Sequence, residues 1–125
     1  MSEPKKILRL SIKPIYLNQI LSGRKTKEYR DIRPSLQKRY CELDSEGYCK
    51  TDANGTLIPR EWDAIRFFCG KQTALVEITG AEIVLFADKT GKLIEHQENG
   101  ARYVAAQVIY SLGKILENNN GAKQG

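Results

Sequence analysis

"LSIKPIYLNQILSGRKTKEYRDIRP", residues 10–34, is the stretch that decides the fold, because the spacing of its apolar side chains changes twice. Residues 7–13 alternate apolar and polar side chains, which is the pattern of a half-buried β-strand. Residues 14–21 then have helical spacing, with a proline near the start and Gly23 as the expected C-cap. Residues 25–32 return to an extended pattern. The chain is therefore predicted to open with a strand, a helix and a second strand.

The rest of the chain adds mainly strands. Residues 62–70 and 73–87 are predicted strands, and 102–118 fits helix or strand by its apolar content, with β-branched and aromatic residues favouring strand. A short helix is expected near Ser35, whereas 88–101 is polar and expected to be irregular. We find no internal repeat. The predicted fold is mostly β with one or two helices, a small β-barrel of about five to six strands, because closure removes exposed strand edges.

Length and composition favour one domain spanning residues 1–125, with a core over about 7–117 and a loose tail at 118–125. No apolar run approaches the roughly 20 residues of a membrane span, and the N-terminus lacks a signal-peptide core. We therefore expect a cytoplasmic monomer that does not bind membranes. The three cysteines form no C-x-x-C pair and the single histidine has no sequence partner, so no metal and no cofactor are expected.

Positive charge is concentrated at the beginning of the chain. Residues 1–40 hold eleven Lys/Arg and three Asp/Glu, a net +8, whereas the remainder carries −3. Such segregation indicates a basic surface that could attract phosphates, although a solvated charged face gives the same pattern.

The motif G-x-K-x-x-E-x-R follows the predicted helix, as Gly23, Lys25, Glu28 and Arg30. On a strand, Glu28 and Arg30 share one face. One interpretation is an ordinary surface ion pair, which contributes at most about 1 kcal/mol. The other is a small polar cleft, in which Lys25 and Arg30 bind a phosphate or a polarised carbonyl. Glu28 would then accept a hydrogen bond or act as a base.

Other side chains could belong to the same cleft. Lys13 and Tyr16 lie at the junction of the first strand and the helix, and Tyr16 could equally pack at the core boundary. Tyr103 could stack on a base or serve as a structural aromatic of a late strand. Three further cations could extend a phosphate track or simply be solvated: Arg33, Lys38 and Arg39.

The motif and its flanks resemble the ASCH domain, a branch of the PUA-like superfamily. The resemblance covers about residues 7–117 and is strongest over 8–34, where the strand, helix, turn and second strand match. It implies a PUA-like barrel with a cleft beside the signature that binds RNA or a nucleoside or nucleotide. Gly23, Lys25, Glu28 and Arg30 occupy the signature positions.

The resemblance also leaves an enzymatic alternative open. Some members are described as ribonucleases, and one branch hydrolyses the acetyl amide of a modified cytidine with a Lys, a Thr and a distant Glu. This chain has Glu28 where that branch has its Thr, with Thr26 nearby. In a hydrolase, Lys25 and Glu28 would be the catalytic residues, and four glutamates could supply the distant carboxylate: Glu77, Glu82, Glu95 and Glu98. The sequence leaves open whether a reaction is catalysed and what the 42–60 loop does.

Overall fold

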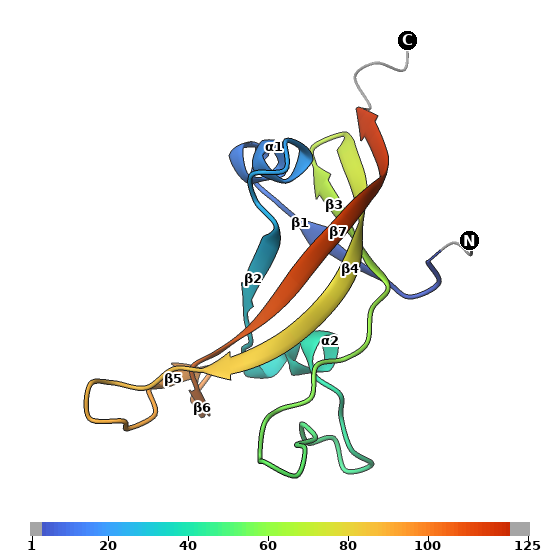
Figure 1. Cartoon of the computed structure of the whole chain (residues 1–125). Coiled ribbons are helices and arrows are strands. Elements are labelled where there is room, and N and C mark those ends of the chain that lie inside the picture. The colour runs from blue at the N-terminus through green and yellow to red at the C-terminus, as the bar shows by residue number, and fades with distance from the viewer. Residues whose placement is uncertain (1–3, 121–125) are drawn as a thin grey trace. The chain divides into compact units, whose positions relative to one another are not determined.

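The computed structural model describes residues 4–120, which are mostly β-strand with two short α-helices. This confirms the predicted fold class. In chain order the elements are β1 (Ile7–Ser11), α1 (Pro14–Leu21), β2 (Lys27–Asp31), the 3-10 helix η1 (Pro34–Leu36), α2 (Gln37–Tyr40), β3 (Ala64–Cys69), β4 (Gln72–Leu85), β5 (Glu95–Glu98), β6 (Ala101–Val104) and β7 (Ala106–Asn120) (Figure 1). Residues 121–125, the end of the predicted tail, lie outside the described residues.

Five strands form one sheet in the order β1-β3-β4-β7-β2, and β5 pairs with β6 in a second sheet. β1 runs parallel to β3, with Leu8 opposite Ile65, and β3 runs antiparallel to β4, with Phe67 opposite Ala74. A parallel pair needs a long connection, and here α1, β2 and α2 all lie in the chain between β1 and β3. The five-stranded sheet is consistent with the small barrel of about five to six strands that the sequence predicts.

The chain divides into two compact units, each with its own apolar core. The first unit comprises residues 1–28, 61–80 and 110–125, and the second comprises 29–60 and 81–109. The first core includes Leu8, Leu10, Leu17, Ile20, Ile65, Phe67, Leu75, Val76 and Tyr110. The second core includes Ile32, Tyr40, Cys41, Ile83, Ala105, Ala106 and Val108.

The excess of positive charge belongs to the first unit alone. Its segments hold eleven Lys/Arg against six Asp/Glu, a difference of +5, whereas the second unit holds nine of each. An electrostatic attraction for phosphates is therefore expected from the first unit.

Helix α1 follows the predicted pattern of start and stop signals. Pro14 occupies its first turn, where the missing N–H costs nothing, and Leu17 and Ile20 are its buried residues. The helix lies against β3. It ends at Ser22, and Gly23 follows with φ of +83°, a conformation that a side chain would strain.

The 88–101 segment is more regular than its composition predicts. It contains β5 and the turn into β6, so the expectation of irregular structure is wrong there. The sequence signal for this hairpin is Asn99-Gly100. Both residues have positive φ, 51° and 82°, as in the two-residue turns that connect the strands of a β-hairpin.

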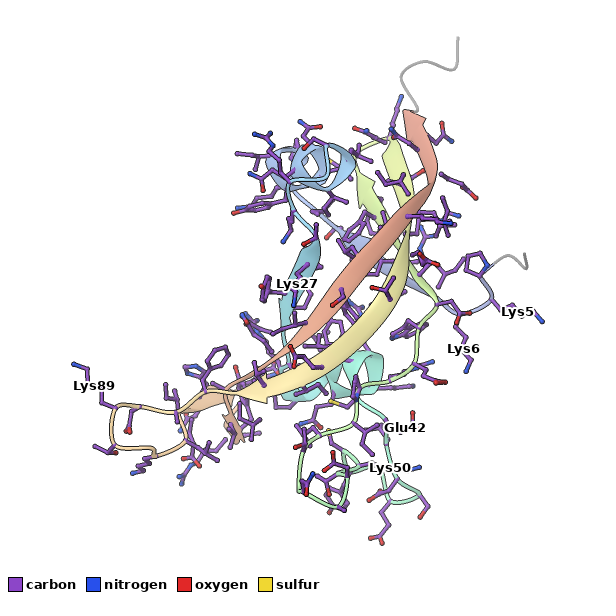
Figure 2. The ribbon with its side chains drawn as sticks, viewed as in Figure 1. Lys5, Lys6, Lys27, Glu42, Lys50 and Lys89 are labelled. Atoms are coloured by element: carbon purple, nitrogen blue, oxygen red, sulfur yellow. The ribbon has the colours of Figure 1, made fainter. Side chains whose placement is uncertain are left out.

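A short turn motif, D-x-x-G-x, occurs three times in the second unit and was overlooked in the sequence. At Asp44, Asp52 and Asp88 the carboxylate accepts the N–H groups of the residues two and four positions later. An antiparallel bridge between the flanking residues closes each loop: Leu43 with Cys49, Thr51 with Leu57, and Ala87 with Leu93. Aspartate stabilises such turns by binding its own backbone. The long 41–60 segment is therefore a pair of tight hairpins, also tied by an ion pair of 3.8 Å between Glu42 and Lys50 (Figure 2).

Candidate functional site

The turn after α1 positions the lysine of the signature motif. The N–H of Gly23 donates to the carbonyl of Ile20 at 3.1 Å, and the N–H of Lys25 donates back to the carbonyl of Gln19 at 3.0 Å. Lys25 is thereby fixed to the last turn of the helix. β2 then begins at Lys27, so the backbone on both sides of Lys25 is held by hydrogen-bonded structure.

Lys25 and Glu28 form an ion pair that is largely withdrawn from solvent. The Nζ of Lys25 lies 3.3 Å from Oε1 of Glu28, and the exposed fractions of the two side chains are 20% and 6%. The same Nζ donates to the carbonyl of Lys27 at 2.6 Å and lies 5.9 Å from the ring centroid of Tyr16. An ammonium over an aromatic face is attracted by the ring quadrupole. Three neighbouring groups thus hold this lysine in place.

Glu28 has an unusual environment for a charged residue. Among residues 4–120 it is the one charged side chain that is buried. An ordinary surface ion pair is therefore the wrong description of the motif, because a buried carboxylate loses hydration that only its protein partners can replace. β2 alternates as predicted: Lys27, Tyr29 and Asp31 are exposed, whereas Glu28 is buried and Arg30 half-buried.

A cavity of about 260 Å³ lies beside this ion pair. Gly23, Lys25 and Thr26 line one part of it, and the apolar side chains of Val76, Leu112 and Ile115 line another. Its volume is below the roughly 300–1,000 Å³ of sites that enclose a drug-sized ligand. Lys25 is the one cation in its lining, which is otherwise mainly apolar, and neither Glu28 nor Tyr16 lines it.

The remaining predicted site residues have different surroundings. Lys13 is exposed at the N-cap of α1, and its carbonyl accepts the N–H groups of Tyr16 and Leu17. Tyr103 belongs to the second unit, where it pairs with His96 on the β5–β6 hairpin. The structure thus brings Tyr16, Lys25 and Glu28 together and places Arg30 and Tyr103 in the second unit.

A larger cavity in the first unit, about 760 Å³, was not predicted. Trp62 is half-buried and lines it. Charged residues of this lining form hydrogen bonds and ion pairs within the protein. Asp63 accepts the N–H groups of Lys5 and Lys6, the residues before β1 (Figure 2), and Arg66 pairs with Glu117 at 3.2 Å.

The distant glutamates considered for a hydrolase all have other surroundings. Glu77 lines the larger cavity and accepts the N–H of Lys114 at 3.2 Å. Glu95 pairs with Arg102 at 2.7 Å, Glu98 binds Ser35, and Glu82 is exposed in the second unit. Within the first unit, Glu28 is therefore the carboxylate that accompanies Lys25.

Within residues 4–120, no group of three or more His, Cys, Asp or Glu side chains is arranged to hold a metal ion. Neither helix of this part of the chain, α1 with eight residues or α2 with four, could span a membrane.

Comparison of the chain with protein-family models, with curated proteins and with solved structures finds no match. A fold supports many activities, so function has to be inferred from the geometry and chemistry of the site. That site consists of Gly23, Lys25 and Glu28 of the signature motif, with Tyr16 beside them.

Proposed function

We propose that this chain is a PUA-like, ASCH-type module that binds RNA or a nucleoside or nucleotide through the signature site. Lys25 donates to a phosphate or carbonyl oxygen of the ligand. Glu28 holds Lys25 in position, and Tyr16 covers the ammonium. Gly23 allows the backbone to turn beside the ligand. Arg30, two residues after Glu28 on β2, belongs to the second unit and is given no part in this site.

The observation that carries this proposal is the burial of Glu28 against Lys25. A buried ion pair is weak evidence for stability, because desolvation of two charges offsets most of their attraction. Because Lys25 also lines a cavity, the pair is better explained by recognition, in which Glu28 holds the cation in place for an anionic or carbonyl group. The +5 charge of the same unit adds long-range attraction for a polyanion.

Binding of a short single-stranded RNA to Lys25→Ala tests the proposal. Loss of one charge-assisted hydrogen bond, about 1.5–3 kcal/mol, should weaken the complex roughly tenfold or more. The matched control is Lys71→Ala, which removes an exposed lysine of the same unit from the β3–β4 turn. Equal weakening in both variants would mean that charge alone, and no specific site, attracts the RNA.

A hydrolase that acts on a modified nucleoside or on RNA is the second candidate. It is favoured by one observation, the shared lining of the cavity by Lys25 and Thr26. Thr26 or a water molecule would attack the carbonyl or phosphorus as Glu28 takes its proton and Lys25 stabilises the oxyanion. The amide or P–O bond would then break, and Glu28 would return the proton to the leaving group.

The enzymatic candidate is tested by incubating the protein with acetylated and unmodified nucleosides and with RNA. Products are followed by mass spectrometry beside Lys25→Ala and Glu28→Ala. A product that both variants still form would exclude catalysis at this site. RNA binding without any product would leave the binding module as the function.

A further inference from the structure

The second unit contains a cavity of about 710 Å³ that the signature motif does not explain. Its volume falls within the range of roughly 300–1,000 Å³ that is typical of small-ligand sites. Three ring side chains line it, Phe86, His96 and Tyr103, together with the aliphatic side chains of Ile32 and Ile94.

The rings have a defined arrangement. His96 and Tyr103 are register partners across β5 and β6, with ring centroids 5.8 Å apart and planes inclined at 57°. Phe86 and Ile94 are joined by a backbone hydrogen bond of 3.0 Å and remain 39% and 37% exposed. Large apolar side chains are usually buried more completely than this. The cavity thus presents a tilted ring pair and a partly uncovered phenyl group to a ligand.

Hydrogen-bond acceptors complete the lining. Asp31 accepts the side-chain amide of Gln107 at 2.9 Å, and Glu98 accepts the N–H and the hydroxyl of Ser35 at 3.0 and 2.9 Å. These contacts fix both carboxylates. A carboxylate offers about four lone-pair positions, so each retains acceptor capacity for a ligand.

The charge of the lining argues against a phosphate as the ligand. Arg33 is its one Lys/Arg side chain and stands against the two carboxylates of Asp31 and Glu98. The whole unit has as many acidic as basic residues. A flat, uncharged molecule with N–H donors fits better than an anion, because it can stack on the rings and donate to the carboxylates.

We propose that this cavity binds a nucleobase that carries an exocyclic amine, such as guanine, cytosine or adenine. The base stacks on Tyr103 and Phe86 and donates its amine hydrogens to Asp31 or Glu98. Uracil, which has no amine, binds more weakly. The residues that line this cavity all belong to the second unit, and none of them is Gly23, Lys25 or Glu28 of the signature motif.

The test is calorimetric titration of the full chain with guanosine, cytidine, adenosine and uridine in about 0.5 M NaCl, where contacts between exposed charges and phosphates are screened. Tyr103→Ala should weaken nucleoside binding at least about fivefold, the effect of losing one stacked aromatic, whereas Tyr103→Phe should retain it. Tyr48→Ala is the matched control, because Tyr48 is 70% exposed in the same unit and does not line the cavity. Thermal melting of each variant checks that it folds.

A short cytidine oligonucleotide, titrated in parallel, distinguishes a free nucleoside from a base within an RNA strand. Binding of either probe that is lost in Tyr103→Ala and kept in Tyr48→Ala supports the inference. Absence of binding to both probes in the wild-type protein would overturn it, and so would equal affinity in Tyr103→Ala. Binding that depends on Lys25 but not on Tyr103 would overturn it as well and leave the signature-site proposal standing.

Discussion

The surroundings of Glu28 in the structure differ from those that its motif alone would suggest. As a sequence pattern, a Glu between two cations is compatible with a solvated pair. In the structure the side chain is 6% exposed and faces the ammonium of Lys25 at 3.3 Å. The cost of desolvating both groups makes this pair dependent on accurate geometry.

We predict that Glu28→Gln lowers the free energy of unfolding by about 1–3 kcal/mol, because it leaves the partly buried ammonium of Lys25 without its charged partner. Lys25→Met should relieve part of this loss when the two substitutions are combined. Urea denaturation of the single and double variants gives the coupling energy. A coupling below about 0.5 kcal/mol would indicate a pair no stronger than an exposed one.

Cys41 permits a prediction about chemical reactivity. Burial, with a smaller effect of the neighbouring Cys49 thiol, raises the pKa of Cys41 to about 12. Because only the thiolate reacts, alkylation of Cys41 at pH 8 should be roughly a thousandfold slower than that of a free cysteine. Iodoacetamide labelling followed by peptide mass spectrometry measures this, with urea-unfolded protein as the control. Labelling of Cys41 in the folded protein at the unfolded rate would contradict its burial.

At the scale of elements, short-range chemistry fixes the turns. The end of α1, the Asn99-Gly100 turn and the three D-x-x-G-x loops are all closed by contacts between residues close together in the sequence. Glycines or asparagines with positive φ, and aspartates that accept backbone N–H groups, are sufficient to form such turns. These features are predictable from sequence, although the polar composition of residues 88–101 favours irregular structure over the hairpin found there.

The Asp88 loop should weaken in acid. The hydroxyl of Thr90, and then its N–H and that of Lys92, donate to Asp88 and hold the pKa of that carboxyl below its usual value. A lowered pKa in the folded state contributes stability above the ordinary aspartate pKa, and this contribution is lost as the pH falls through the lowered value. An NMR titration of the Thr90 amide in wild type and Thr90→Val follows this. An Asp88 pKa that the substitution leaves unchanged would contradict the assigned cause.

Gly113 is a position in β7 where packing, and not backbone conformation, requires glycine. A Cβ there would collide with the carboxylate of Glu77 and lie 2.7 Å from the γ-methyl of Thr79. Gly113→Ala should therefore destabilise the protein by about 1–3 kcal/mol. Combining it with Thr79→Ser, which removes that methyl, should recover part of the loss in thermal melting. Full stability of the single variant would show that both neighbours can move aside freely.

At the scale of the whole molecule, charge is divided between the two units. The first unit carries all of the +5, and the second is neutral. Lys5, Lys6 and Lys27 are three of the exposed cations of the first unit (Figure 2). We therefore expect the first unit to attract a polyanion. We expect the second unit to bind an uncharged base.

We predict that the affinity for single-stranded RNA falls steeply with salt, because each phosphate contact releases a condensed counterion, about 0.7 per contact for a single strand. Free nucleosides should bind with little dependence on salt. Fluorescence anisotropy with labelled RNA over a salt series, beside calorimetry with cytidine, compares the two. An RNA affinity that does not change with salt would exclude the electrostatic part of the proposed function.

The sequence by itself determined the elements that depend on local periodicity and turn chemistry. The 7–34 region appears as predicted, with β1, α1, the Gly23 turn and β2, and the faces of β2 alternate as expected. Period and capping are properties of neighbouring residues, so a single chain segment contains the information.

Tertiary structure alone decided which side chains meet. Glu28 is buried on β2, whose neighbour in the sheet is β7, a strand far along the chain. The cavity beside His96 and Tyr103 likewise joins distant segments, because Asp31 lies far from both in the sequence. Desolvation and long-range contact are set by the surroundings of a residue in space, and no local pattern encodes them.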